Sequence, residues 1–211
     1  HLLLTGPTGF VGVHVIEALL RPTTAAISCL VRPEKGVSAR SHLRSRLSYY
    51  GLGHLLDDPR VIIETGDLEA PRMGLGDSQH SFLIDSVDTV VHAGAQVNLV
   101  APYAQLRRAN VVSTMSLIEF ARNARRKSIH YLSTLSVLPD GDCFDERSRL
   151  AENTLPLDGY SQTKWVSESL LDGVRRQGLS VSVYRLGEVM PHASTGVMSH
   201  SRSLTEILLE G

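Results

Sequence analysis

Three glycines near the start of the chain, in the segment Thr5-Gly-Pro-Thr-Gly-Phe-Val-Gly12, constrain the fold more than any other feature. They follow a short apolar run at residues 1–4 and precede an apolar segment with helical spacing at 11–20. A glycine turn between a strand and a helix lets a phosphate approach the backbone, because no Cβ is in the way and the first helical N–H groups are free. The segment therefore predicts a dinucleotide-binding unit, although its GxxGxxG spacing differs from the GxGxxG fingerprint.

Apolar runs alternate with helical patterns along the rest of the chain. The sequence predicts strands at residues 1–4, 26–31, 61–64, 87–92, 128–133 and 180–185, and helices at 11–20, 38–50, 110–125 and 159–176. Strands that are separated by helices form parallel sheets through right-handed crossovers. We therefore expect an α/β fold of Rossmann type, with a doubly wound parallel sheet that helices cover on both faces.

Apolar residues at helical spacing indicate which face of each predicted helix is buried. These residues are Val11, Val15, Ala18 and Leu19 in the first helix, Leu43 and Leu47 in the second, and Val111, Met115, Ile118 and Ala121 in the third. We expect all of these side chains to face the sheet.

Composition excludes several classes of protein. The 211 residues carry a net charge of -1 and 42% of them are apolar, so neither nucleic acid nor a membrane surface is an expected partner. No apolar run reaches the about 20 residues of a membrane span, and the strand-like beginning is not typical of a signal peptide. Cys29 and Cys143 lack a CxxC pattern, which is typical of free thiols in a reducing, cytoplasmic compartment. We expect no metal site, and His192 and His200 are expected at the surface.

The end of the second predicted strand bears on which dinucleotide binds. Enzymes that use NAD place an Asp or Glu there, about 20 residues past the glycines, to bond the ribose hydroxyls. Here Arg32 ends the strand, and Arg40 and Arg44 follow on the next helix. A guanidinium suits the 2′-phosphate of NADP(H). The alternatives are NAD, bound through the nearby Glu34, and an Arg32 that is only a solvated charge.

Two further strand ends are expected to contact the cofactor. Gly66-Asp67-Leu68 follows the third strand, where Asp67 can accept a hydrogen bond from the adenine amino group. His92-Ala-Gly-Ala95 follows the fourth strand, and its small residues let the backbone approach the cofactor closely. His92 itself is expected to be a packed or capping residue rather than a catalytic one.

Tyr160 and Lys164 carry the candidate chemistry. They are four residues apart and share one face of a helix. An ammonium near a phenol favours the phenolate and is expected to lower the tyrosine pKa. Such a pair can stabilise an oxygen that gains charge during hydride transfer. Ser133, Thr134 and Ser136 lie at the end of the fifth strand, so a hydroxyl from this group is expected at the same edge of the sheet. The spacing alone is common on helix surfaces; its combination with the glycine turn makes it specific.

These segments resemble the extended short-chain dehydrogenase/reductases. Among these enzymes the chain is similar to the thioester reductase domains, also called terminal reductase domains, of nonribosomal peptide and polyketide synthases and of carboxylic acid reductases. The resemblance rests above all on Val91-His-Ala-Gly-Ala-Gln-Val-Asn98 and Gly159-Tyr-Ser-Gln-Thr-Lys-Trp-Val166, which separate these reductases from sugar epimerases. One departure is Arg185-Leu186-Gly187, where the family usually has Arg-Pro-Gly.

The resemblance implies roles for individual residues. It implies that Thr134, Tyr160 and Lys164 form a catalytic triad, in which Tyr160 and Lys164 also contact the cofactor. The other residues that it implies bind NADP(H) are Gly6, Thr8, Gly9, Phe10, Val11, Gly12, Arg32, Asp67, Leu68, Ala93, Gly94, Ala95, Asn110, Leu186 and Val189. It also implies that Asn110 supports the active site from its helix.

The implied reaction is the NADPH-dependent release of an acyl or peptidyl thioester from a phosphopantetheine-bearing carrier protein. The product is an aldehyde, which some relatives reduce further to an alcohol. The resemblance also implies that residues 1–211 are the NADP(H)-binding part of a larger reductase domain, whose C-terminal substrate-binding portion is truncated here. We therefore expect this chain alone to bind NADPH without turnover. The alternatives are a nucleotide-sugar epimerase or dehydratase that holds NAD, and a non-catalytic dinucleotide-binding module.

Overall fold

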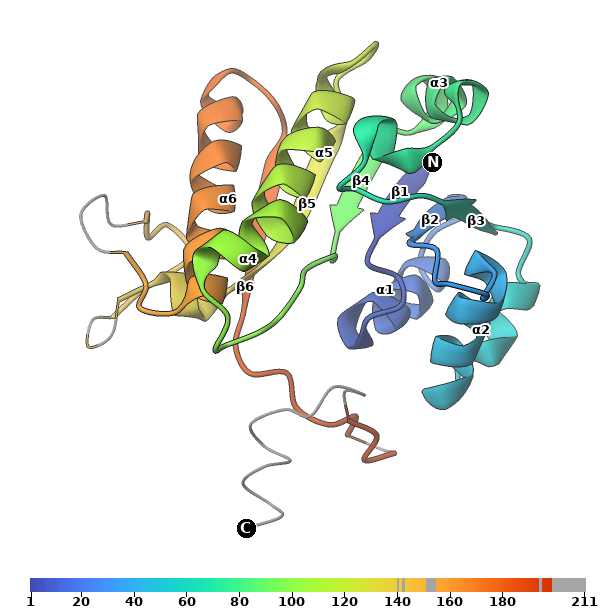
Figure 1. The fold of residues 1–211 in the computed structure, drawn as a ribbon, viewed down its shortest axis with the longest axis horizontal. Coiled ribbons are helices and arrows are strands. Elements are labelled where there is room, and N and C mark those ends of the chain that lie inside the picture. Colours follow the sequence, from blue (N-terminus) through green and yellow to red (C-terminus); the bar gives the residue numbers. More distant parts are fainter. Residues whose placement is uncertain (140, 142, 151–154, 194, 199–211) are drawn as a thin grey trace.

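The computed structural model describes residues 1–139, 141, 143–150, 155–193 and 195–198. These residues contain a six-stranded parallel sheet in the order β3-β2-β1-β4-β5-β6 (Figure 1). The strands are β1 (Leu2–Thr5), β2 (Ile27–Val31), β3 (Val61–Thr65), β4 (Thr89–His92), β5 (Ser128–Thr134) and β6 (Val181–Leu186). The strand order reverses between β1 and β4, and ligands bind at such a switch point in doubly wound sheets. The predicted fold class is confirmed.

Helices cover the two faces of the sheet in separate groups. The helices are α1 (Phe10–Leu20), α2 (Ala39–Tyr49), α3 (Asp77–Ser86), α4 (Tyr103–Arg107), α5 (Ser113–Arg122) and α6 (Gly159–Arg176). Short 3₁₀ segments are η1 (Gly53–Asp57), η2 (Pro71–Gly74) and η4 (Leu135–Val137), and a π-helical turn is η3 (Arg108–Val112). Neighbouring strand residues point to opposite faces. Leu3 therefore packs with α3, α5 and α6, and Leu4 packs with α1 and α2.

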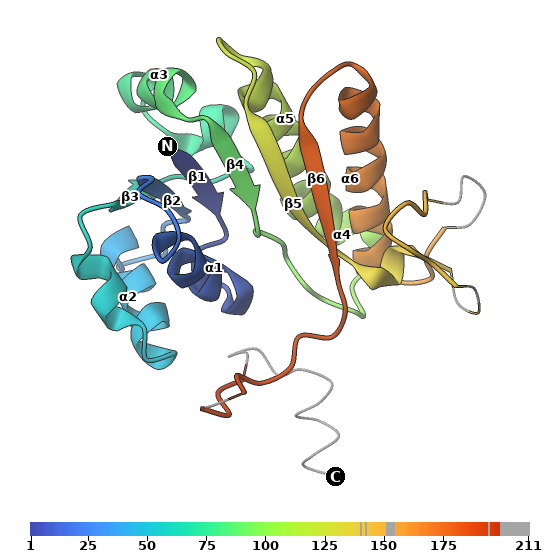
Figure 2. The ribbon, with the colours of Figure 1, turned by 180° about the vertical axis from the view of Figure 1, so that it is seen from behind.

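The expectation that helices cover both faces everywhere is wrong at β5 and β6. Figure 2 shows these two strands in front of α5 and α6, with no helix of the described part over them. The ring of Tyr184 on β6 is 45% exposed there and stacks on His130 of β5 at 5.8 Å between ring centroids. This half of the sheet is therefore buried on one face only in the described part of the chain.

The predicted helix at 110–125 is wrong in its start, its end and one of its buried residues. The helical rod begins at Tyr103 as α4, passes through η3 and continues as α5 only to Arg122. It ends there because Asn123 adopts an extended backbone with ψ of 145°, and Ala124 after it is left-handed with φ of 54°. The π-helical turn holds one extra residue and so rotates the buried face. As a result Met115 is 47% exposed.

The buried face of α1 also differs from the prediction. Gly12, Val13, Ile16 and Leu20 are buried, whereas Ala18 is exposed. Nearly every residue of this helix is apolar, so periodicity could not fix its orientation. The contact of Gly12 with the preceding turn fixes it instead, because an added Cβ would lie 2.0 Å from the Gly6 carbonyl oxygen.

The remaining predicted elements lie within two residues of the observed ones. Ser38 caps α2 by accepting from the Ser41 N–H group, and Leu43 and Leu47 are buried as predicted. Helix α3 was missed, since it is mostly polar and buries only Leu83. No helix of the described residues is long and apolar enough to cross a membrane.

Candidate active site

The turn between β1 and α1 is closed by contact between backbones. Gly6 has a left-handed φ of 69°, and a Cβ on it would lie 2.5 Å from Gly94 Cα in the loop after β4. Gly9 is the N-cap residue of α1 and provides no side-chain cap for its first N–H groups. Free N–H groups at a helix start, with no Cβ above them, are what a pyrophosphate needs. The turn therefore fits a dinucleotide; Thr8 lies in it, and Phe10, Val11 and Gly12 form the first turn of α1.

The loop after β4 forms the second wall of this turn. Ala93 donates its N–H to the Thr5 carbonyl at 3.2 Å, which keeps the loop against β1. Gly94 and Ala95 follow directly and are partly exposed. The structure thus brings the predicted residues of β1 and β4 together at the switch point of the sheet.

Arg32 stands at the end of β2 and is mostly exposed. The carboxylate of Glu34 lies 3.2 Å from His42 Nε2, so it is engaged with α2. Arg40 bonds the Leu56 carbonyl and Arg44 approaches an acid of η1, so both point away from the cofactor edge. The structure therefore keeps Arg32 as a candidate for the 2′-phosphate, and it does not bring Arg40 or Arg44 to it.

Asp67 organises the loop after β3. Its Oδ1 accepts from the Glu69 N–H at 2.9 Å, and its own N–H donates to the Met73 carbonyl at 2.7 Å. Leu68 packs against the core beneath this loop. Both residues lie at the predicted adenine edge, and Asp67 in addition fixes the backbone of the loop.

Asn110 links three parts of the site from the π-helical turn. Its Oδ1 accepts from the Gln96 N–H at 2.7 Å, and its Nδ2 donates to the Gln96 carbonyl at 3.0 Å and to Thr163 Oγ1 at 2.9 Å. Thr163 in turn donates to the Tyr160 carbonyl at 2.6 Å. Both amide hydrogens are thus used within the protein, so the structure shows Asn110 as a support of α6 and of the loop after β4.

Lys164 is anchored at the end of β5. Its Nζ donates to the Leu132 carbonyl at 2.7 Å and lies 4.6 Å from the centroid of the Tyr131 ring. Burial lowers the pKa of Lys164 to about 8, and the nearby carboxylate of Glu168 opposes part of that shift. The ammonium is therefore held in a buried position one helical turn from Tyr160.

The predicted effect of Lys164 on Tyr160 is wrong. Burial raises the pKa of Tyr160 to about 12, and the charge of Asp158 adds to that rise. Desolvation of the phenolate outweighs any help from the ammonium, whose hydrogen bond goes to the strand instead. Tyr160 is therefore a protonated phenol at neutral pH and can donate a hydrogen bond.

Thr134 and Leu186 lie side by side at the carboxyl ends of β5 and β6, where they are paired in register. The Thr134 hydroxyl accepts from the Ser136 N–H at 3.2 Å and so also caps η4. Val189 follows β6 in a loop and is 46% exposed. The strand ends thus bring Thr134 to the same edge as the Leu132 carbonyl that holds Lys164.

His92 is a packed residue, as predicted. Its Nδ1 shares a hydrogen bond of 2.6 Å with Thr5 Oγ1, and burial lowers its pKa to about 3, with the Lys164 charge adding to the shift. His192 is exposed but stacks on His14 at 5.6 Å. His200 lies outside the described residues. Cys29 is a buried free thiol and Cys143 an exposed one.

A buried ion pair behind Lys164 escaped the sequence reasoning. Glu168, with a side chain 4% exposed, accepts from Arg185 Nη2 at 2.8 Å and from the Ser133 hydroxyl. Arg185 also donates to the Ser148 carbonyl at 2.9 Å. The pair ties α6, β5, β6 and the loop before α6 together. The only signal in the sequence was spacing, since Glu168 is four residues past Lys164 on the same helix.

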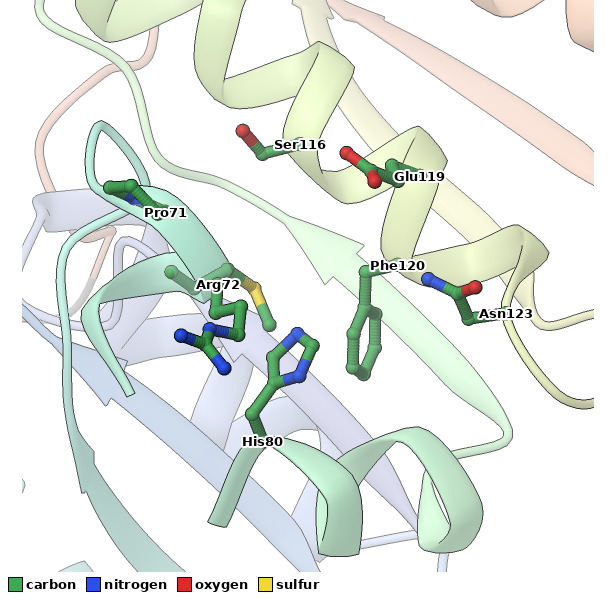
Figure 3. A pocket seen from close by; sticks show the side chains of 8 residues that line it. Pro71, Arg72, His80, Ser116, Glu119, Phe120 and Asn123 are labelled. Atoms are coloured by element: carbon green, nitrogen blue, oxygen red, sulfur yellow. The ribbon is translucent and has the colours of Figure 1, made fainter. Parts of the chain in front are cut away.

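Two hollows lie outside the glycine turn. A groove of about 1100 Å³ runs along α6 and β6 and meets the site at Leu135 and Leu186. A smaller pocket of about 130 Å³ lies between η2, α3 and α5, where His80 lies beside the ring of Phe120 and Arg72 lies on the other side of His80 (Figure 3). None of the predicted site residues lines the smaller pocket.

A pyrophosphate-fitting turn at the switch point and a tyrosine–lysine pair at the neighbouring strand end together define a short-chain dehydrogenase/reductase type of dinucleotide-binding domain. The chain belongs to the NAD-binding family described as "Male sterility protein", whose model matches residues 4–211.

Similar proteins narrow this class further. The chain is 39% identical over 219 residues to glycine betaine reductase ATRR of Emericella nidulans, covering 99% of the chain and 17% of that protein. It is 37% identical over 215 residues to isonitrile lipopeptide synthase of Streptomyces coeruleorubidus, covering 100% of the chain and 14% of that protein. The terminal R domain of the myxalamid PKS-NRPS pathway superposes with a TM-score of 0.90 at 37% identity, covering 99% of the chain and 54% of that domain. The resemblance to terminal reductase domains is confirmed.

The alternative of a sugar-nucleotide enzyme is not favoured. A dTDP-glucose 4,6-dehydratase from Streptomyces venezuelae superposes with a TM-score of 0.67 at 23% identity, covering 88% of the chain and 55% of that enzyme. At that identity the likeness shows the shared fold alone. The chain thus spans about half of the solved domains it matches and a small part of the longer synthases.

Proposed function

We propose that this chain carries the hydride-transfer centre of an NADPH-dependent thioester reductase. The proposed substrate is an acyl or peptidyl thioester on the phosphopantetheine arm of a carrier protein, and the product is an aldehyde or, after a second reduction, an alcohol. The observation that carries the proposal is the anchoring of Lys164, one helical turn after Tyr160, on the Leu132 carbonyl two residues before Thr134. The chain that holds this arrangement superposes on a terminal R domain with a TM-score of 0.90. A solved thiolation-reductase di-domain, 26% identical, supports a carrier protein as the partner.

Three side chains, those of Tyr160, Thr134 and Lys164, would stabilise the oxyanion that forms during the reaction. When bound, NADPH would supply hydride to the thioester carbonyl carbon. The Tyr160 phenol remains protonated, since burial raises its pKa to about 12, and it donates a hydrogen bond to the carbonyl oxygen. Thr134 contributes a second hydroxyl from the strand end. The Lys164 ammonium places a fixed positive charge behind this oxygen. Collapse of the resulting hemithioacetal expels the thiol and leaves the aldehyde.

We propose NADP(H) rather than NAD(H) as the cofactor. Arg32 ends β2 with a mostly exposed guanidinium, whereas the nearby Glu34 is engaged with His42. A guanidinium gains most from a phosphate, and a ribose hydroxyl would favour a free carboxylate at this place.

Replacing Tyr160 with Phe tests the chemistry. In the full-length protein, Tyr160→Phe should lower the rate of aldehyde formation from a carrier-bound thioester by about 10²–10³-fold, because one oxyanion donor is lost. NADPH affinity, followed by calorimetry, should change by less than about threefold. Tyr49→Phe on α2 is the matched control and should keep full activity. A Tyr160→Phe protein with normal activity would disprove the mechanism.

Residues 1–211 alone should bind NADPH and fail to turn over. The chain covers 54% of the myxalamid R domain, so a large part of that domain has no counterpart in it. Calorimetry should show NADPH binding, and NADPH absorbance should stay constant after a carrier-bound thioester is added. Sustained NADPH oxidation by residues 1–211 would contradict this expectation.

A further inference from the structure

Glu69 lies between two arginines at the edge of the site that the adenosine half of the cofactor would occupy. Its Oε1 is 3.6 Å from Arg32 Nη1, and its Oε2 is 3.1 Å from Arg108 Nε. The three residues come from the end of β2, the loop after β3 and the π-helical turn. One carboxylate therefore holds two guanidinium groups from elements that are far apart in the sequence.

Hydrogen bonds hold both the loop that carries Glu69 and the π-helical turn that carries Arg108. Asp67 accepts the Glu69 N–H in a tight turn, so the carboxylate starts from a set position. Gly66 donates its N–H to the Val31 carbonyl at 3.1 Å, which docks the loop on the end of β2. Arg108 stands two residues before Asn110, which is bonded to Gln96 and Thr163. Both the loop and the π-helical turn are thus held to other parts of the protein by hydrogen bonds.

The two arginine side chains are much more exposed to solvent than the glutamate between them. The side chain of Arg32 is 69% exposed and that of Arg108 is 73% exposed, whereas Glu69 is only 25% exposed. Within this group of three side chains, the two positive charges exceed the single negative charge by one. A phosphate dianion with three oxygens can satisfy both arginines at once, more fully than a single carboxylate does.

We propose that Arg108 is a second 2′-phosphate ligand beside Arg32, and that Glu69 is a competing counter-charge which the phosphate displaces from both arginines. This inference rests on the proposed use of NADP(H) and adds two residues that set the preference for it. Glu69 keeps the arginines near each other in the free protein. It also lowers the affinity for the phosphate, since its bonds must be broken first.

Binding of NADPH and NADH, measured by calorimetry on the full chain, tests the inference. Arg108→Ala should weaken NADPH about tenfold and leave NADH within about twofold, because only NADPH carries the 2′-phosphate. Glu69→Gln should tighten NADPH about threefold or more with little effect on NADH. Arg107→Ala, which removes the exposed neighbouring arginine, is the matched control and should change neither affinity by more than about twofold.

Adenosine 2′,5′-bisphosphate and 5′-AMP provide a readout without the nicotinamide. Arg108→Ala should weaken only the bisphosphate. The assignment is overturned if Arg108→Ala weakens both nucleotides equally. It is also overturned if neither Arg108→Ala nor Glu69→Gln changes the affinity for the bisphosphate. Thermal melting shows whether each variant is folded, and Arg108→Lys, which keeps the charge, should restore part of the affinity. If Arg32→Ala weakens NADPH no more than NADH, the proposed cofactor itself is wrong. If Arg32→Ala weakens NADPH selectively and Arg108→Ala does not, the second ligand is wrong and the proposed function stands.

Discussion

The β1–α1 turn and the β5–α6 contact meet at one edge of the sheet and are built on opposite principles. The turn works by what is missing, because Gly6 and Gly12 leave no atoms between two backbones that already touch. The β5–α6 contact works by what is present, because Lys164 and Glu168 are buried and each has a specific partner. Adding an atom should therefore disrupt the β1–α1 turn, whereas removing a side chain should disrupt the β5–α6 contact.

The largest effect is expected when the buried ion pair is broken. Arg185→Ala would leave the Glu168 carboxylate buried without its cation and should lower the free energy of unfolding by about 3–5 kcal/mol. Urea unfolding measures this loss. Arg175→Ala removes an exposed arginine at the end of α6, the helix that carries Glu168. This variant should lower the free energy of unfolding by less than about 1 kcal/mol. Similar losses in both variants would show that burial of the pair does not distinguish this region.

An added methyl group tests the turn in the opposite sense. The Cβ of Gly12→Ala would lie 2.0 Å from the Gly6 carbonyl oxygen. The variant should lose about 1–3 kcal/mol of stability through overpacking and bind no NADPH in calorimetry. Gly173→Ala in α6 is the control, since its Cβ would meet nothing within 4 Å. It should be stabilised by up to about 1 kcal/mol, because alanine favours the helix. NADPH binding by the Gly12→Ala protein would contradict this account of the turn.

A smaller effect is expected on mild acidification, at the point where the two regions join. His92 bonds Thr5 of β1 and lies near Lys164, and its pKa in the folded protein is lowered to about 3. An unfolded histidine titrates at about 6.5, so the unfolded chain binds the additional proton as the pH falls from 6.5 toward 3. Stability should therefore decrease over this window, by about 1 kcal/mol at pH 5.5 from His92 alone.

Urea unfolding at several pH values separates this contribution from those of other histidines. His92→Asn keeps a polar group beside Thr5 and has no proton to bind in this range. Its stability should change less with pH than that of the original protein between pH 7 and 5. Identical pH profiles would show that His92 is not the group responsible.

The same contrast explains what the sequence could predict. Glycines at fixed spacing are visible as letters, so the turn, its strand and its helix were predicted to within a residue. Tyr160 and Lys164 were found because they share a helix face. The long-range partners were not predictable, because nothing in the local pattern joins Glu168 to Arg185, or Glu69 to Arg32 and Arg108. Such pairs can be predicted only once the strand order is known.

Burial also determines the direction of the pKa shift of Tyr160, which the neighbouring charge alone does not predict. An ammonium near a phenol suggests a lowered tyrosine pKa, but the surroundings of Tyr160 raise it. How far a group is desolvated depends on tertiary packing, which the spacing of two residues does not contain. The same holds for the buried face of α1, where a nearly uniform apolar sequence leaves orientation to the Gly6–Gly12 contact.

The π-helical turn at Arg108–Val112 places two residues of one short segment against different parts of the molecule. It interrupts the phase of the rod, so that Arg108 meets the loop after β3 while Asn110, two positions later, meets α6. Under the proposed roles, substitutions of Arg108 should alter nucleotide preference, and substitutions of Asn110 should weaken the support of α6, although both residues belong to the same turn. In evolutionary terms, a lineage could change its cofactor at this helix and retain its chemistry.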